Sequence, residues 1–314
     1  MSPRLLWKVI SRAVAGWWND NVPRLGASLS YYTLFALAPV LVVAIAIAGL
    51  AFGPEAVRGE IVAQIRALVG DGGASAVQAM LEGAGKKSES RLATVLGLLT
   101  FFIGATGAFL ELQTALNAIW RVKPKEGGNW LKELVMQRLV SFGLVIGVGF
   151  LLLVSLLVSA ALTALHRYMG HTYPGLAELW QAANVLVSFG VVTLLFAMIY
   201  RVLPDVELTW RDVWLGAIVT ALLFSVGKFL IGLYLGTSGL TSTYGAAGSV
   251  VVLLLWVYYS SQIVLLGAEF TRAWVELVGE RVRPMKHARK DPAPEATGGE
   301  EAAGRAGGGD VVKG

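Results

Sequence analysis

Long apolar stretches alternate with short polar segments along most of this chain. Six stretches of about twenty residues carry almost no charge, and a helix of that length crosses the roughly 30 Å hydrocarbon layer of a bilayer. They fall at 33–52, 93–112, 139–165, 183–200, 214–235 and 249–268. The pattern therefore predicts an all-α fold, a polytopic membrane bundle of six transmembrane helices within residues 25–275.

The segments on either side of this bundle have different patterns. In residues 1–24, Ser2 can cap a helix that begins at Pro3. The basic and apolar side chains of that helix fall on separate faces, Arg4, Lys8 and Arg12 on one and Leu6, Val9, Ala13 and Trp17 on another. This pattern is typical of an amphipathic helix in the cytoplasmic headgroup layer. Residues 276–314, rich in Pro, Gly, Ala and Glu, are expected to be a largely disordered cytoplasmic tail.

Residues 53–91 form the longest connection between predicted spans. Ile61, Ile65 and Leu68 recur there at helical spacing. We expect interfacial helices on the outer face of the membrane. Lys and Arg counts in the flanks place nineteen basic residues on the side of both termini and six on the other side. By the positive-inside rule, both termini are predicted to be cytoplasmic.

Composition agrees with a membrane protein. Of the 314 residues, 55% are hydrophobic and 15% are charged, and the mean hydropathy is +0.64. There is no cysteine, which excludes disulfides, iron–sulfur clusters and thiolate metal sites. The net charge of +5 is typical of cytoplasmic loops beside anionic headgroups, so it does not require nucleic acid. No small-residue cleavage site follows the start, and we expect that no signal peptide is removed.

Four segments carry a resemblance to a known family. They are GASLSYYTLFALAP at 26–39, GAFLELQTALNAIW at 107–120, YRVLPD at 200–205, and YGAAGS at 244–249 running into 256–270. In this order and spacing the chain resembles the YihY/virulence factor BrkB family of bacterial inner-membrane proteins, over about residues 10 to 275. The resemblance implies six membrane helices, an inner-membrane location and transport or envelope-related roles. Members have also carried a ribonuclease label, but the family offers no catalytic motif to transfer.

The residues themselves do not favour an enzyme. His166 and His171 lie in a loop that the charge count places outside the cytoplasm, and His287 lies in the expected tail. No clustered acidic motif, metal-binding spacing, phosphate-binding loop or nucleophile elbow is present. We therefore predict no catalytic residue, no metal, no cofactor and no nucleic-acid partner.

Lys228 is the one basic residue inside a predicted span. It lies fourteen residues into that span, about 21 Å from its cytoplasmic start at ~1.5 Å per residue. A charge at that depth is expensive and marks a functional candidate. Small residues on the same helical face suggest that Lys228 points into protein or a cavity. The alternative is a lysine that extends toward the outer headgroups or makes a structural bond.

Other polar residues gather at the predicted cytoplasmic half of the bundle. Gln113 and Asn117 share a face of the second span, from which Glu111 projects away, and Tyr258, Gln262 and Glu269 share a face of the sixth. Further charged residues at about the same level are Arg138, Arg201, Asp205 and Arg272. Two interpretations remain open. The residues bind the helices to one another, or they line a vestibule that faces the cytoplasm.

The loop at 236–248 contains glycines and hydroxyls but no charge. It is either a re-entrant segment or a flexible outer loop. Together these features favour a translocator of an anionic or amphipathic envelope component such as a lipid, with Glu111 or Glu269 as proton carrier if transport is uphill, because no ATP-binding sequence is present. The alternative is a non-transporting scaffold for envelope assembly. The expected partners are membrane lipids, with envelope proteins or a second copy of the chain as further candidates.

Overall fold

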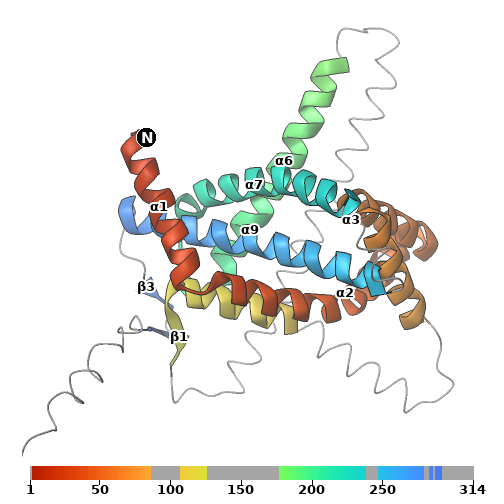
Figure 1. Ribbon diagram of the computed structural model, residues 1–314, viewed down its shortest axis with the longest axis horizontal. Helices are drawn as coiled ribbons and strands as arrows, with labels where there is room; N and C mark the ends of the chain where they lie inside the picture. The colour runs from red at the N-terminus through yellow and green to blue at the C-terminus, as the bar shows by residue number, and fades with distance from the viewer. Residues whose placement is uncertain are drawn as a thin grey trace, which may run out of the picture.

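The computed structural model describes residues 2–85, 107–125, 177–237, 247–278, 283–285 and 287–291, and these are mostly helical (Figure 1). The named helices are α1 (Pro3–Asn19), α2 (Val22–Phe52), α3 (Pro54–Gly85), α6 (Ala177–Val202), α7 (Trp210–Thr237) and α9 (Gly248–Val278). A further helix occupies 107–120. Four short strands complete the described part, namely β1 (Val122–Pro124), β2 (Val206–Glu207), β3 (Arg283–Pro284) and β4 (Ala288–Lys290).

Four described helices are long and apolar enough to cross a membrane. The stretches are Val22–Val42, Val185–Val202, Trp210–Leu235 and Gly248–Val278, which match the predicted first, fourth, fifth and sixth spans. The helical class is confirmed, and these four helices have the length and apolar composition of membrane spans, although the first stretch overlaps the predicted 33–52 only in part. Residues 93–106 and 139–165 lie outside the described residues, so the number six stays a prediction.

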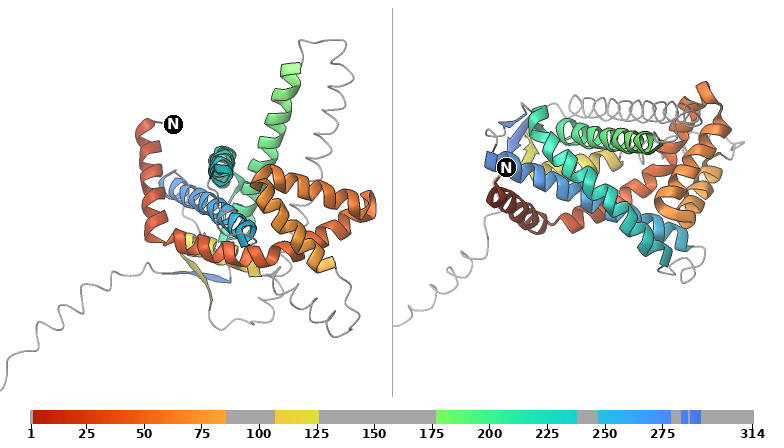
Figure 2. Two further views of the ribbon diagram at one scale, coloured as in Figure 1. Left: turned by 45° about the vertical axis from the view of Figure 1, so that its right-hand side comes forward. Right: turned by 90° about the horizontal axis from the view of Figure 1, so that it is seen from above.

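Helix α9 lies at the centre of the described bundle. It packs against α1, α2, α3 and α7. In the left view of Figure 2, α9 lies between α7 and α2. The largest apolar core joins α6, α7, α9 and the helix at 107–120. Its fully buried members include Leu116, Tyr200, Val213 and Leu265. The central position of α9 makes its polar residues the ones that most need partners inside the protein.

Helix α1 begins as the sequence predicts. Ser2 caps it, with its hydroxyl oxygen accepting a hydrogen bond from the Leu5 amide at 3.3 Å, and Pro3 is the first helical residue. Val9, Ala13 and Gly16 are buried. Both views show α1 crossing the long helices at one end of the bundle (Figures 1 and 2), which we call the α1 end. Placement of this helix in a headgroup layer stays a prediction.

Helix α3 occupies most of the connection predicted to be interfacial. Gly53, between α2 and α3, has φ +84°, and Gly70, inside α3, has φ +80°. Because only glycine adopts this region without steric cost, the two positions allow the chain to turn and bend there. Val69 and Val77, on either side of the bend at Gly70, pack against Val257 and its neighbours on α9. The helical prediction holds through Gly85, whereas the membrane-surface location stays untested.

The structure corrects the predicted start of the tail. Helix α9 continues to Val278, and the chain beyond it forms two strands rather than a disordered segment beginning at 276. Strand β4 pairs antiparallel with β1, and β3 pairs antiparallel with β2. The partners of these strands are supplied by distant parts of the chain, so local composition could not reveal them. Residues 292–314 lie outside the described residues, as do residues 238–246 of the predicted re-entrant loop.

Candidate functional site

Asp205 is the centre of the first polar cluster at the α1 end. It lies between α6 and α7, and its side chain is 7% exposed. Its carboxylate accepts hydrogen bonds from Gln113 Nε2 at 3.1 Å and Asn117 Nδ2 at 2.8 Å. Its own amide donates to Asn117 Oδ1 at 2.8 Å. His287 Nε2 lies 3.1 Å from Asp205 Oδ1. The carboxylate therefore holds together the helix at 107–120, the α6–α7 connection and the segment after α9.

Local sequence explains how this cluster forms. Gln113 and Asn117 are four residues apart on one helix, so their amides lie on one face about one turn from each other. The backbone completes the connection, because the Met285 amide donates to the Asp205 carbonyl at 3.0 Å. With both carboxylate oxygens and the backbone groups occupied, Asp205 binds helices together. For Asp205, Gln113 and Asn117, the contacts thus fit the interpretation that the polar residues bind the helices to one another.

Arg272 is the centre of the second cluster. Its Nη1 contacts Asp20 Oδ2 at 2.6 Å and donates to the carbonyl of Ile119 at the end of the helix at 107–120. Arg121 Nη2 lies 3.6 Å from Asp20 Oδ1. Glu269 lies 3.6 Å from the Arg272 guanidinium, and Glu276 lies 3.5 Å from it on the outer side. One guanidinium therefore joins the α1–α2 turn, the helix at 107–120 and α9.

Glu269 and Gln262 differ from Asp205 in having unsatisfied polar atoms. Glu269 is 1% exposed, and neither of its carboxylate oxygens accepts a hydrogen bond from the described residues. Both side-chain amide atoms of Gln262 are also buried without a hydrogen-bond partner there. Gly16 lies directly against Glu269, and Gly26 lies against Gln262. A side chain at either glycine would occupy the space that these polar groups fill.

Tyr258, Gln262 and Glu269 form a polar stripe along α9. At ~100° per residue the three positions fall within about 40° of one another and span about 16 Å along the helix. The contacts with Gly16 and Gly26 show that the stripe faces α1 and α2. Tyr258 is half-buried on the same face. Gln262 and Glu269, two of the three residues predicted to share a face, thus point toward neighbouring helices, and their role stays a prediction.

Three further predicted residues, Glu111, Arg201 and Lys228, make no hydrogen bond or ion pair with this stripe in the described structure. Arg201 stacks on the Trp210 ring at 4.4 Å and donates to the Leu208 carbonyl at 3.4 Å. Glu111 is half-buried on the helix at 107–120. Lys228 is exposed on the surface formed by the described residues, so these residues do not enclose it as the small-residue pattern suggested. Arg138 lies outside the described residues.

Sequence reasoning missed two participants in the clusters. Asp20 was not singled out, although it is the only acidic residue before Glu55, and that isolation was an available signal. His287 was assigned to a disordered tail, and only strand pairing brings it to Asp205. Among the described residues, no group of three or more His, Cys, Asp or Glu side chains is arranged to hold a metal ion.

Small residues on α7 and α9 bring buried hydroxyls into contact. Gly216 lies against Thr271, and Gly267 lies against Thr220 and Tyr200. The Tyr200 hydroxyl donates to the Val264 carbonyl at 2.7 Å and lies 2.9 Å from Thr220 Oγ1. These two glycines, which were not singled out from the sequence, therefore allow close packing of α7 on α9 inside the bundle.

Comparison with known proteins identifies relatives of this sequence. The sequence pattern described as "Virulence factor BrkB" matches residues 13–292. A UPF0761 membrane protein of Ralstonia nicotianae is 30% identical over 80% of this chain and 55% of its own length. One of Rhodospirillum centenum is 32% identical over 84% of this chain and 56% of its own. A third, of Pseudomonas aeruginosa, is 31% identical over 80% and 58%.

This chain spans a little over half the length of these curated relatives. No solved structure matches it.

Proposed function

The chain belongs to the virulence factor BrkB family and is a membrane protein, and from this premise we propose that it moves an anionic or amphipathic envelope component, such as a lipid, across the bilayer. The observation that carries the proposal is the polar stripe of α9. Two of its members, Gln262 and Glu269, are buried without hydrogen-bond partners among the described residues.

The contrast with Asp205 gives this observation its weight. Leaving a buried polar group without a partner costs about 1–3 kcal/mol, and more for a charged group. A polar residue that serves only to join helices is expected to have its partners, as Asp205 has. Among the described residues, Gln262 has no such partner, and Glu269 has only the 3.6 Å ion pair with Arg272, so the two groups are better explained as contacts for polar atoms that pass between the helices. This supports the vestibule interpretation for Gln262 and Glu269.

The charge distribution supports an anionic cargo. Arg272 and Arg121 lie at the α1 end of the stripe. Lys228 lies eighteen residues into α7 from Trp210, about 27 Å along the helix at ~1.5 Å per residue. Because Arg272 and Arg121 are already paired with Asp20, Glu269 and Glu276, the exposed Lys228 is the positive group that would attract a phosphate-bearing headgroup. In this proposal Lys228 contacts the lipid from the surface of α7 rather than from an enclosed cavity.

A scaffold for envelope-assembly proteins receives less support. A scaffold would need small-residue helix faces that are free to bind partners. Gly16, Gly26, Gly216 and Gly267 instead lie against side chains of this same chain. The exposed face of α1 is the feature that a scaffold would still have available.

Lipid translocation can be tested in proteoliposomes. The purified protein is reconstituted with fluorescent phosphatidylglycerol, and dithionite reduction reports how fast the inner-leaflet probe reaches the outer leaflet. The wild type is expected to accelerate this exchange without ATP, and Gln262→Leu and Glu269→Gln to slow it. Glu276→Gln is the matched control, because Glu276 also contacts Arg272 but is half-exposed at the outer side of α9.

The outcomes separate the parts of the proposal. A wild-type rate equal to that of protein-free liposomes would exclude phosphatidylglycerol as a cargo and favour the scaffold. Acceleration that survives both stripe substitutions would show that the path lies elsewhere. For Lys228, mass spectrometry of lipids that co-purify in native-membrane nanodiscs compares wild type with Lys228→Met. Enrichment of an anionic lipid that is lost in the variant supports the contact, and bulk composition in both samples contradicts it.

A further inference from the structure

Helix α1 presents three different faces. The first, formed by Val9, Ala13 and Gly16, is buried, with Val9 and Ala13 packed against Phe270 and Ala273 near the end of α9. The second exposes large apolar side chains, namely Leu6, Trp7, Ile10, Val14 and Trp18. The third carries the exposed basic residues Arg4, Lys8 and Arg12. No acidic residue occurs between Pro3 and Asn19.

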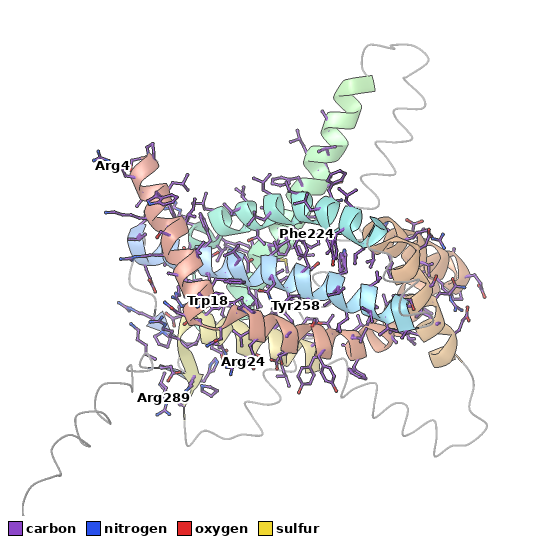
Figure 3. All side chains as sticks on the ribbon, viewed as in Figure 1. Arg4, Trp18, Arg24, Phe224, Tyr258 and Arg289 are labelled. Carbon is purple, nitrogen blue, oxygen red and sulfur yellow. The ribbon has the colours of Figure 1, made fainter. Side chains whose placement is uncertain are left out.

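The exposed apolar face is unusual for a helix that touches only water. Trp7 and Trp18 are 71% and 72% exposed in the described structure, and they lie near opposite ends of the helix. Figure 3 shows Arg4 at the free end of α1 and Trp18 where the helix approaches α2. At ~100° per residue, the apolar and basic faces are centred about 120° apart. Because α9 holds the first face, the directions of the other two are fixed.

The orientation of α1 relative to the spans suggests what covers these faces. Helices α2, α7 and α9 contain membrane-spanning stretches, and α1 crosses them at their end (Figures 1 and 2). A helix in that position lies along the membrane surface. Apolar and aromatic residues on one face with Lys and Arg on another match a helix at the boundary between headgroups and acyl chains. Positive charge without any acidic residue favours anionic headgroups.

We propose that α1 binds anionic lipid headgroups at the membrane surface, and that lipid bound there keeps Asp20 in contact with Arg272. Asp20 ends α1, and its amide donates to the Gly16 carbonyl at 2.8 Å. Its carboxylate contacts Arg272 at 2.6 Å and Arg121 at 3.6 Å. The position of α1 therefore sets the position of the carboxylate.

The packing of Gly16 makes this link stiff. Gly16 has no room for a side chain, because Glu269 fills the space beside it. A shift of α1 away from α9 would separate Asp20 from Arg272, which also holds the Ile119 carbonyl. Binding of α1 to an anionic membrane surface thus affects the end of the helix at 107–120, because Arg272 contacts both Asp20 and the Ile119 carbonyl. This binding surface does not depend on whether the protein moves lipid.

Spin labels on the 314-residue chain test the lipid contact. Because the chain contains no cysteine, Val14→Cys places a single nitroxide on the apolar face, and Ala15→Cys places one on the basic side as the matched control. Both positions are exposed. Collisions with oxygen and with a water-soluble nickel complex measure depth in nanodiscs of phosphatidylcholine, with or without phosphatidylglycerol. Correct folding is checked by size-exclusion chromatography of each variant.

The expected result is a label at position 14 in the acyl-chain boundary and one at position 15 among the headgroups. Phosphatidylglycerol should increase the depth at position 14. Replacing Arg4, Lys8 and Arg12 together by Gln should remove that response, since three charges change the ratio of bound to detached α1 by about a hundredfold. Equal nickel accessibility at the two positions, or no response to phosphatidylglycerol, would overturn the lipid contact. Spin–spin broadening between labels on two chains would instead show that the apolar face of α1 binds a second copy of the protein.

A label at Ala118→Cys, an exposed position at the end of the helix at 107–120, tests the link through Asp20. Phosphatidylglycerol should reduce the mobility of this label in the otherwise unchanged protein. The variant Asp20→Asn should abolish that change while the depth response at position 14 remains. Mobility at position 118 that ignores phosphatidylglycerol, or that responds equally in Asp20→Asn, would refute the link.

Discussion

The hydrogen bonds of Asp205 predict a specific pattern of loss and rescue. In Asp205→Asn, one acceptor oxygen becomes a donor amide, and the negative charge is lost. The side chain then places an N–H against Asn117 Nδ2, or, turned over, against Gln113 and His287. Either orientation loses at least one hydrogen bond that now benefits from charge. Asp205 lies outside the apolar stretches Val185–Val202 and Trp210–Leu235, so values measured in water are the better guide.

A hydrogen bond to a charged group contributes about 1.5–3 kcal/mol. Since the Asp205 side chain is only 7% exposed, solvent screens little of this contribution, and Asp205→Asn should destabilise the fold by about 2–3 kcal/mol. Asn117→Asp should also destabilise it, because two carboxylates would then meet where a 2.8 Å hydrogen bond stood. The double variant reverses donor and acceptor. The new side-chain amide at position 205 would donate to the new carboxylate at position 117, and that carboxylate would still accept from the backbone amide at position 205.

The assay is an SDS titration of the protein in mixed micelles, followed by tryptophan fluorescence. A double-mutant cycle over the two positions should show a favourable coupling of about 1–3 kcal/mol, as expected for side chains in direct contact. The double variant should therefore be more stable than either single one. Losses that simply add, or an Asp205→Asn protein as stable as wild type, would show that this network does not hold the helices together.

Three further predictions concern the α1 end. Arg272→Gln removes the partner of Asp20 in a largely buried pair and should lower the free energy of unfolding by about 3–5 kcal/mol, more than Arg272→Lys, in the same titration. Gly16→Ala should destabilise the packing of α1 on α9 by pressing on Glu269, and adding Glu269→Ala should restore part of the loss; no rescue would contradict the contact. A stop after residue 279 should lower the free energy of unfolding by about 2–4 kcal/mol, because the hydrogen bonds of β3 and β4 are lost. A stop after residue 291 should leave the melting temperature unchanged. Equal effects of the two truncations would refute a structural role for 283–291.

The hydrophobic pattern was sufficient to predict four of the described elements. A run of about twenty apolar residues has one stable form in a bilayer, because a helix satisfies its own backbone hydrogen bonds. For this reason the stretches in α2, α6, α7 and α9 could be predicted without knowing their neighbours. The start of α1 was equally local, because the Ser2 cap and Pro3 act within one turn.

The candidate site was predictable as a group but not in its connections. Periodicity placed Gln262 and Glu269 on one face of α9 and Gln113 and Asn117 on one face of another helix. It did not show that Asp205 would satisfy Gln113 and Asn117 while Gln262 and Glu269 remained without hydrogen-bond partners among the described residues. Depth along a span is a local property, whereas the distance between two spans depends on how the helices pack.

The sequence alone determined that this is a helical membrane protein of the BrkB family, where four of its spans lie, and which residues are polar within them. The tertiary structure decided that Arg272 joins Asp20 to Ile119, that His287 returns to Asp205, and that Lys228 is exposed on the described surface. The reason is the range of the interactions. Helix formation and capping act between residues a few positions apart, while ion pairs such as Arg272 with Asp20 and strand pairs such as β1 with β4 join segments that meet only after the bundle has packed.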